Sequence, residues 1–167
     1  MDTPKAEKHS DSHFDWGEFY QYVNKAYGNI ESPGYSFAQS FYENKKYPKL
    51  AEFLEVNYQF LGGAEPNTDV SYGYLLKENE VESILRVSIV GPYFYLSSII
   101  SDGSQGVPDV SVDEEDFTSP LLSFMSEHGF VFTSREILKK KNMFGREFVS
   151  VYSVIYCYED EPLWVTG

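Results

Sequence analysis

The chain has 167 residues, long enough to bury the core of one domain without metal ions or disulfide bonds, and its 42% hydrophobic content excludes a disordered protein. A formal net charge of −13 opposes binding to nucleic acid and to anionic membranes, and it favours a basic partner. The 14 Tyr and 13 Phe are many for this length, and such a tyrosine content is typical of a half-exposed sheet or an interaction surface.

The first residues of the chain are polar. Residues 1–13 contain His9 and His13 and predict a flexible tail ahead of a single domain over 14–167. They have no apolar core of the kind found in signal peptides, and no stretch of the chain approaches the roughly 20 apolar residues of a membrane span. With Cys157 as the one cysteine, an internal disulfide is excluded, and we expect a cytoplasmic protein.

The best helix signal comes directly after this tail. Asp15 is a good N-cap, and Glu18 three residues later completes a variant of the capping box. Apolar residues follow at helical spacing until Gly28, so the pattern predicts a helix over 15–28.

Two further helices are expected in the first third of the chain. A second capping box predicts a short helix over 36–44. A longer helix over 48–61 begins with Pro48, which suits the first helical position, and Gly62–Gly63 is expected to stop it.

The hydrophobic period then changes from helical spacing to alternation. Strands are predicted over 70–77, 81–90 and 93–101, and their short links indicate an antiparallel meander. The strand over 93–101 is apolar on both faces, which is typical of a central strand.

The segment after the meander is aperiodic. Residues 102–118 are expected to form a long loop, and Ser119 with Pro120 resembles the N-cap and first position of a helix over 119–128. Phe130, Val131 and Phe132 then predict a short strand.

The C-terminal part gives one open choice and one clear prediction. Residues 133–141 fit either a helix or one arm of a hairpin, whereas 146–158 predicts a long strand that is apolar on both faces. The whole order of elements predicts an α+β domain whose helices pack mainly on one face of an antiparallel sheet.

The charge is concentrated in the middle of the chain. Residues 61–133 have two basic and twelve acidic side chains, whereas 134–147 has five basic and two acidic ones. Six acids in or beside the predicted loop are candidates for contact with a basic partner: Asp102, Asp109, Asp113, Glu114, Glu115 and Asp116. The competing interpretations are a solvated charge run and acids that stabilise the dipole of the following helix.

The basic residues have their own interpretations. Lys139, Lys140 and Lys141 are best explained as side chains at the C-terminal end of a helix, or as a patch that docks on an acidic face of a second copy. We therefore expect a monomer or a weak homodimer.

No motif for catalysis, metal binding or a cofactor is found. The acidic run lacks the ligand spacing of an EF-hand, and "LGGAEP" lacks the lysine of a phosphate-binding loop. His9, His13 and His128 have no partner cysteines for a zinc site. Cys157, which lies between tyrosines, is expected to be buried and inert.

Three functions remain as hypotheses. The profile is similar, at the level of a class, to that of bacterial immunity proteins, which are small, acidic and cytosolic and block the basic active sites of toxins; no motif points to one such family. The second hypothesis is a small-molecule-binding or sensing domain with a pocket lined by Tyr72, Tyr74, Tyr93 and Tyr95. The third is an enzyme of an unrecognised type.

Overall fold

A computed structural model describes residues 14–43, 46–64, 69–78, 81–99, 115–157, 161–162 and 165. The predicted tail over 1–13 and most of the predicted loop over 102–118 lie outside these residues. The helices are α1 (Trp16–Tyr27), α2 (Ser36–Glu43), α3 (Pro48–Asn57), α4 (Glu115–Glu127), α5 (Arg135–Lys139) and α6 (Val151–Ile155). The strands are β1 (Gln59–Ala64), β2 (Ser71–Glu78), β3 (Val81–Ser88), β4 (Tyr93–Ile99), β5 (Val131–Phe132), β6 (Lys141–Phe144) and β7 (Glu147–Ser150).

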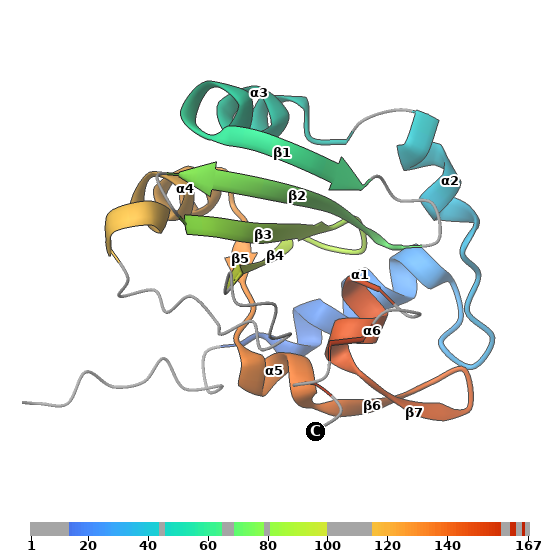
Figure 1. Ribbon diagram of the computed structural model, residues 1–167. Helices are drawn as coiled ribbons and strands as arrows, with labels where there is room; N and C mark the ends of the chain where they lie inside the picture. Colours follow the sequence, from blue (N-terminus) through green and yellow to red (C-terminus); the bar gives the residue numbers. More distant parts are fainter. Residues whose placement is uncertain are drawn as a thin grey trace, which may run out of the picture.

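A five-stranded sheet in the order β1-β2-β3-β4-β5 forms the centre of the molecule (Figure 1). Strands β1 to β4 are antiparallel neighbours, and β5 adds to β4 in parallel through two residue pairs. The predicted α+β class and the antiparallel meander are confirmed. Strands β6 and β7 form a separate hairpin, whose turn residues Gly145 and Arg146 both have positive φ.

Helix α1 begins as its capping signal predicts. The Asp15 carboxylate accepts a hydrogen bond from the backbone N–H of Glu18 at 2.9 Å, and Gly28 ends the helix with a φ of 79°. The helix buries Phe19 and Val23 against the rest of the domain.

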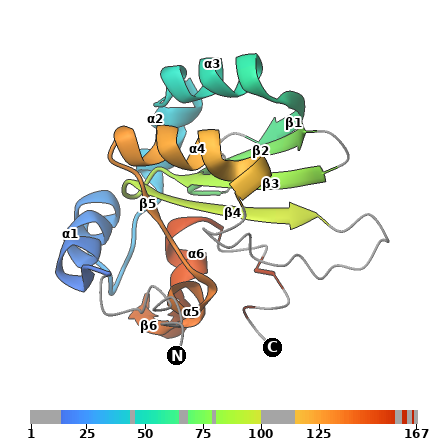
Figure 2. The same cartoon turned by 90° about the vertical axis from the view of Figure 1, so that its left-hand side faces the viewer.

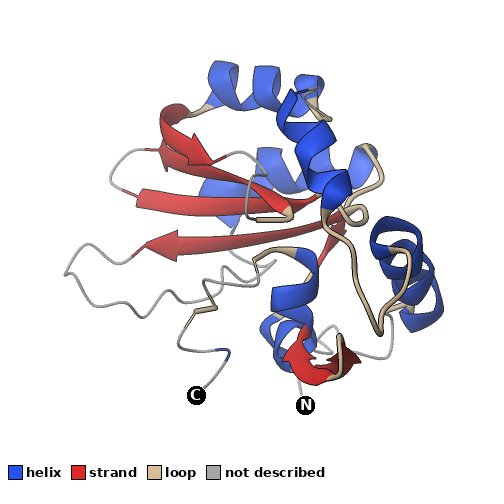
Figure 3. Ribbon diagram, turned by 90° about the vertical axis from the view of Figure 1, so that its right-hand side faces the viewer, coloured by secondary structure: helices blue, strands red, loops and turns tan. Residues whose placement is uncertain are grey.

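Helices cover both faces of the sheet, so the expectation that they pack mainly on one face is wrong (Figures 2 and 3). Helices α3 and α4 lie on one side, where their rings Phe53 and Phe124 stack at 4.3 Å. Helices α1, α5 and α6 lie on the other side. The reason is β4, whose Phe94 faces the first layer while the adjacent Tyr95 faces the second, so both faces need cover.

The predicted helix over 48–61 is too long. Helix α3 ends at Asn57, and β1 begins at Gln59 and pairs with β2, with a bulge between Phe60 and Gly62. Helical spacing of apolar residues continues into this segment, but the ladder formed with β2 satisfies its backbone groups and overrides the local pattern.

The start of α4 also differs from the prediction. The helix begins at Glu115 rather than at Ser119, so Pro120 lies inside it. The misleading signal was the Ser–Pro pair, which marks helix starts in general but here follows one turn of helix.

The long strand predicted over 146–158 is wrong beyond its first residues. Strand β7 ends at Ser150, whose hydroxyl accepts a hydrogen bond from the Ser153 backbone N–H and caps α6. A run that is apolar on both faces fits a buried helix as well as a buried strand. The open choice over 133–141 resolves as a short helix, α5, followed by the β6–β7 hairpin.

Candidate functional site

Two segments on opposite layers of the molecule differ in net charge. Among the side chains that the structure describes, α3 and α4 carry one basic residue, Lys49, and three acidic ones, Glu52, Glu55 and Glu127. The segment 134–147, with a net charge of +3, forms α5 and the hairpin in the opposite layer. We call the side of α3 and α4, with Glu52, Glu55 and Glu127, the acidic face; the sheet lies between it and the layer of α5 and the hairpin (Figure 2).

Exposed apolar side chains border the acidic face. Val56 on α3 is 78% exposed, and Phe60 and Leu61 on β1 are 45% and 40% exposed. Helix α3 runs beside β1, the edge strand of the sheet (Figure 1). We call Glu52, Glu55, Val56, Phe60 and Leu61 the α3–β1 surface. The combination of anionic side chains with apolar ones resembles the core and rim of a protein interface.

The bulge in β1 affects how this surface can be used. It interrupts the regular row of backbone donors and acceptors that would pair with an added strand. Side chains rather than backbone groups therefore dominate what the α3–β1 surface offers to a partner.

The sequence-predicted acidic candidates fall into two groups. Glu115 and Asp116 are the first two residues of α4. Asp102, Asp109, Asp113 and Glu114 lie outside the described residues, and the chain that carries them leads directly into α4.

The four candidate pocket tyrosines do not line one wall. Tyr72 and Tyr74 on β2 stack at 6.4 Å, and Tyr72 donates a hydrogen bond to the Phe41 carbonyl at 2.9 Å. Tyr93 and Tyr95 on β4 are buried in the layer of α1 and α6. Strand register aligns Tyr72 with Phe94 and Tyr74 with Leu96, on the face opposite to Tyr95, although Tyr72 also reaches the buried cluster that contains Tyr93 and Tyr95.

A cavity of about 500 Å³ lies elsewhere, between α1, α2, the turn from β3 to β4 and the link from α4 to β5. Three basic side chains line it, Lys25, Lys46 and His128, together with aromatic rings that include Tyr22 and Phe41. Sequence reasoning missed this group, because its members come from four separate segments and no spacing links them.

Lys46 is the best-defined charged group of the cavity. Its ammonium donates to the Ile89 carbonyl at 3.3 Å and lies 4.9 Å from the centre of the Phe41 ring. Burial, with a further contribution from the charge of Lys25, lowers the pKa of the Lys46 ammonium.

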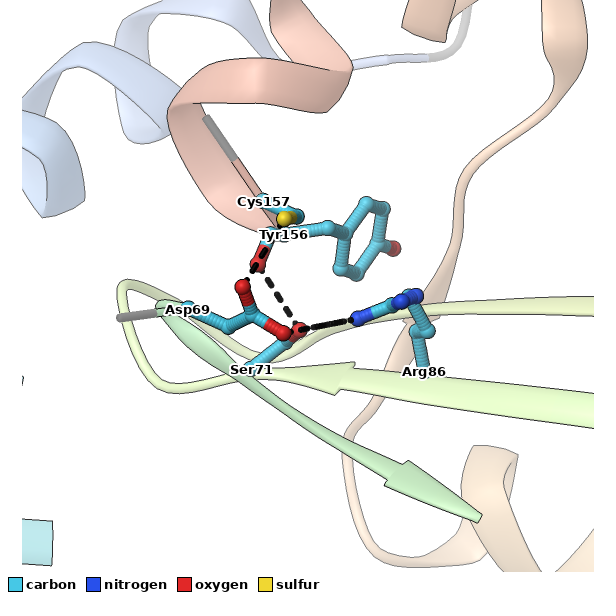
Figure 4. A network of polar contacts seen from close by, with 5 residues as sticks. All are labelled: Asp69, Ser71, Arg86, Tyr156 and Cys157. Atoms are coloured by element: carbon cyan, nitrogen blue, oxygen red, sulfur yellow. Dashed lines mark hydrogen bonds and ion pairs between the residues drawn. The ribbon is translucent and has the colours of Figure 1, made fainter. Parts of the chain in front are cut away.

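A second polar cluster joins the sheet to the end of α6 (Figure 4). The Cys157 thiol donates to Asp69 at 2.8 Å, and Asp69 forms an ion pair with Arg86 at 3.4 Å. The Ser71 hydroxyl donates to the Tyr156 carbonyl at 2.8 Å. Cys157 is only 1% exposed, so this cluster anchors α6 and supports a structural role for the thiol.

Within the described part of the chain, three or more His, Cys, Asp or Glu side chains are nowhere grouped as a metal ion would require. None of the described helices has both the length and the apolarity to cross a bilayer.

Comparison of the chain with protein-family models, with curated proteins and with solved structures finds no match. The acidic face and the cavity are therefore the features that bear on the function of this chain.

Proposed function

We propose that this protein is a binding protein that occupies a basic protein partner, in the manner of an immunity protein that occludes the active site of a toxin or another enzyme. The observation that carries the proposal is the acidic face of α3 and α4, bordered by the exposed apolar residues of the α3–β1 surface. No catalytic step is assigned to the chain.

The charge distribution supports association with a basic partner in two ways. The net charge of −13 attracts a cationic protein over a distance, and the clustering of acids on one face orients the approach. Once contact is made, Val56 and Phe60 can bury apolar area, which charged side chains alone do not supply.

The partner can be identified with matched baits. The test bait carries Glu52→Lys and Glu55→Lys, and the control bait carries Glu31→Lys and Glu136→Lys, which give the same net charge on the opposite layer. Wild-type and control baits are expected to capture the same basic protein from a lysate of the source organism, and the test bait is expected to lose it. Quantitative mass spectrometry reads the result.

Binding kinetics with the captured partner then test the mechanism. We expect association to slow as salt rises, and the α3 charge reversal to slow it on the order of tenfold at low salt. Equal losses for the test and control variants, or an association rate indifferent to salt, would contradict the proposal. Self-association by sedimentation would instead identify a second copy as the partner, which also contradicts it.

A further inference from the structure

The cavity has an electrostatic character opposite to that of the chain as a whole. The molecule carries a net charge of −13, yet the described residues lining the cavity include two lysines and a histidine and neither Asp nor Glu. Basic groups gathered in a concave site without acidic partners are the usual arrangement for holding an anion.

Lys46 retains capacity to bind. An ammonium has three N–H donors, and among the described residues only the Ile89 carbonyl accepts one of them, at 3.3 Å. The Lys46 side chain is solvent-accessible, and the Ile89 carbonyl and the Phe41 ring fix its ammonium at the cavity wall. An anionic group entering the cavity would thus find an ammonium already held in place, with Lys25 lining the same cavity.

The remaining walls suit a flat apolar body. Phe37, Phe41 and Tyr47 line the cavity beside Lys46, and Phe130 closes against Tyr47 with ring centres 5.1 Å apart. At Gly91 a Cβ atom would come within 2.7 Å of the Tyr93 ring and 3.1 Å of Tyr22, so glycine is needed for this wall to pack.

The volume narrows the class of ligand further. About 500 Å³ is within the range of sites for small organic molecules and is too small for a protein segment of the size that a stable interface needs. Aromatic walls with cationic groups match a ring system that carries one acidic group.

We propose that this cavity binds a small aromatic anion, whose ring lies among Phe37, Phe41 and Tyr47 and whose acidic group is held by Lys46 and Lys25. This site goes beyond the proposed protein partner and is independent of it, because it uses no residue of the α3–β1 surface.

A pair of fluorescent probes tests the proposal on the full chain. Anilinonaphthalene sulfonate carries a negative charge, and N-phenylnaphthylamine is its neutral counterpart. We expect saturable binding of one sulfonate probe per chain, weakened about tenfold or more by Lys46→Met, with the neutral probe unaffected. The matched control is Lys49→Met, which removes an exposed lysine on α3 and is expected to change neither titration.

A cavity-filling variant and two competing ligands test the site further. Ala26→Trp fills the cavity from α1 and should abolish binding of both probes, and Lys25→Met replaces Lys46→Met if the latter lowers the melting temperature. Displacement by naphthoate or by naphthyl phosphate distinguishes a carboxylate from a phosphate ligand. Equal weakening of both probes by Lys46→Met, retained binding in Ala26→Trp, or displacement by neither competitor would overturn the proposal.

Discussion

At the scale of single residues, the tyrosines explain an unusual composition. Several of them lie in the core and donate hydrogen bonds to carbonyl groups of other segments, as Tyr27 does to Val154 and Tyr47 to Ser88. The tyrosine content predicted a half-exposed sheet or an interaction surface. In the structure many rings instead fill the core while their hydroxyls satisfy backbone oxygens that regular secondary structure leaves unpaired.

Replacing Tyr27 tests this role. Tyr27→Phe removes the hydroxyl and leaves the buried Val154 carbonyl without that donor, so we expect the free energy of unfolding to fall by about 1–3 kcal/mol. The control is Tyr20→Phe, whose hydroxyl bonds to Asn142 at the surface and whose loss is expected to change stability by about 0.5 kcal/mol or less. Urea denaturation measures both, and equal effects would contradict the expectation.

At the scale of elements, local signals were sufficient only where no tertiary contact competed with them. The cap at Asp15 and the alternation of β2 and β3 were readable from the sequence because a capping side chain and a two-residue period act locally. The strand β1 and the helix α6 were not readable. The first forms because β2 offers a ladder, and the second lies in an apolar run whose period does not discriminate between helix and strand.

Pro120 offers a test of where α4 begins. A helix that starts at Glu115 contains Pro120 in its interior, so Pro120→Ala restores a backbone donor and should raise the free energy of unfolding by about 1 kcal/mol or more. A helix that started at Ser119 would have Pro120 at its first position, where the same change gains nothing. Ser123→Ala, on the same helix, reports the gain from helix propensity alone. Thermal or urea unfolding decides between the two outcomes.

At the scale of the whole molecule, the two candidate sites depend on topology. The charges of α3 and α4 were visible in the sequence, but their meeting on one face follows from the strand order and from both helices packing over Phe94 and Leu96. Lys25, Lys46 and His128 converge for the same reason. Sequence patterns report which face of an element is buried, and they do not report which elements meet.

The buried tyrosines also predict the response of the fold to alkali. Burial raises the pKa of Tyr58 to about 12 and raises the pKa of Tyr27, Tyr93 and Tyr156 as well. The unfolded chain releases these protons near pH 10, before the folded chain does, so their stabilising contribution is complete below about pH 10 and is lost as pH rises through the folded values.

Each such tyrosine reduces the free energy of unfolding by up to about 1.4 kcal/mol per pH unit in that window. We expect the phenolate absorbance that comes from the buried tyrosines to appear together with loss of circular dichroism, in one cooperative transition above pH 10. Ionisation of these buried tyrosines in a chain that keeps its helical signal would contradict this.

Because charge differs between the two outer layers, the electrostatic force on a binding partner depends on the layer it approaches. The screening length at physiological ionic strength is about 8 Å, so a partner close to one outer layer is affected mainly by the exposed charges of that layer. A partner that approaches α5 and the hairpin meets a segment with a net charge of +3, whereas one that approaches α3 and α4 meets Glu52, Glu55 and Glu127. The direction of approach therefore determines which sign of charge a partner meets.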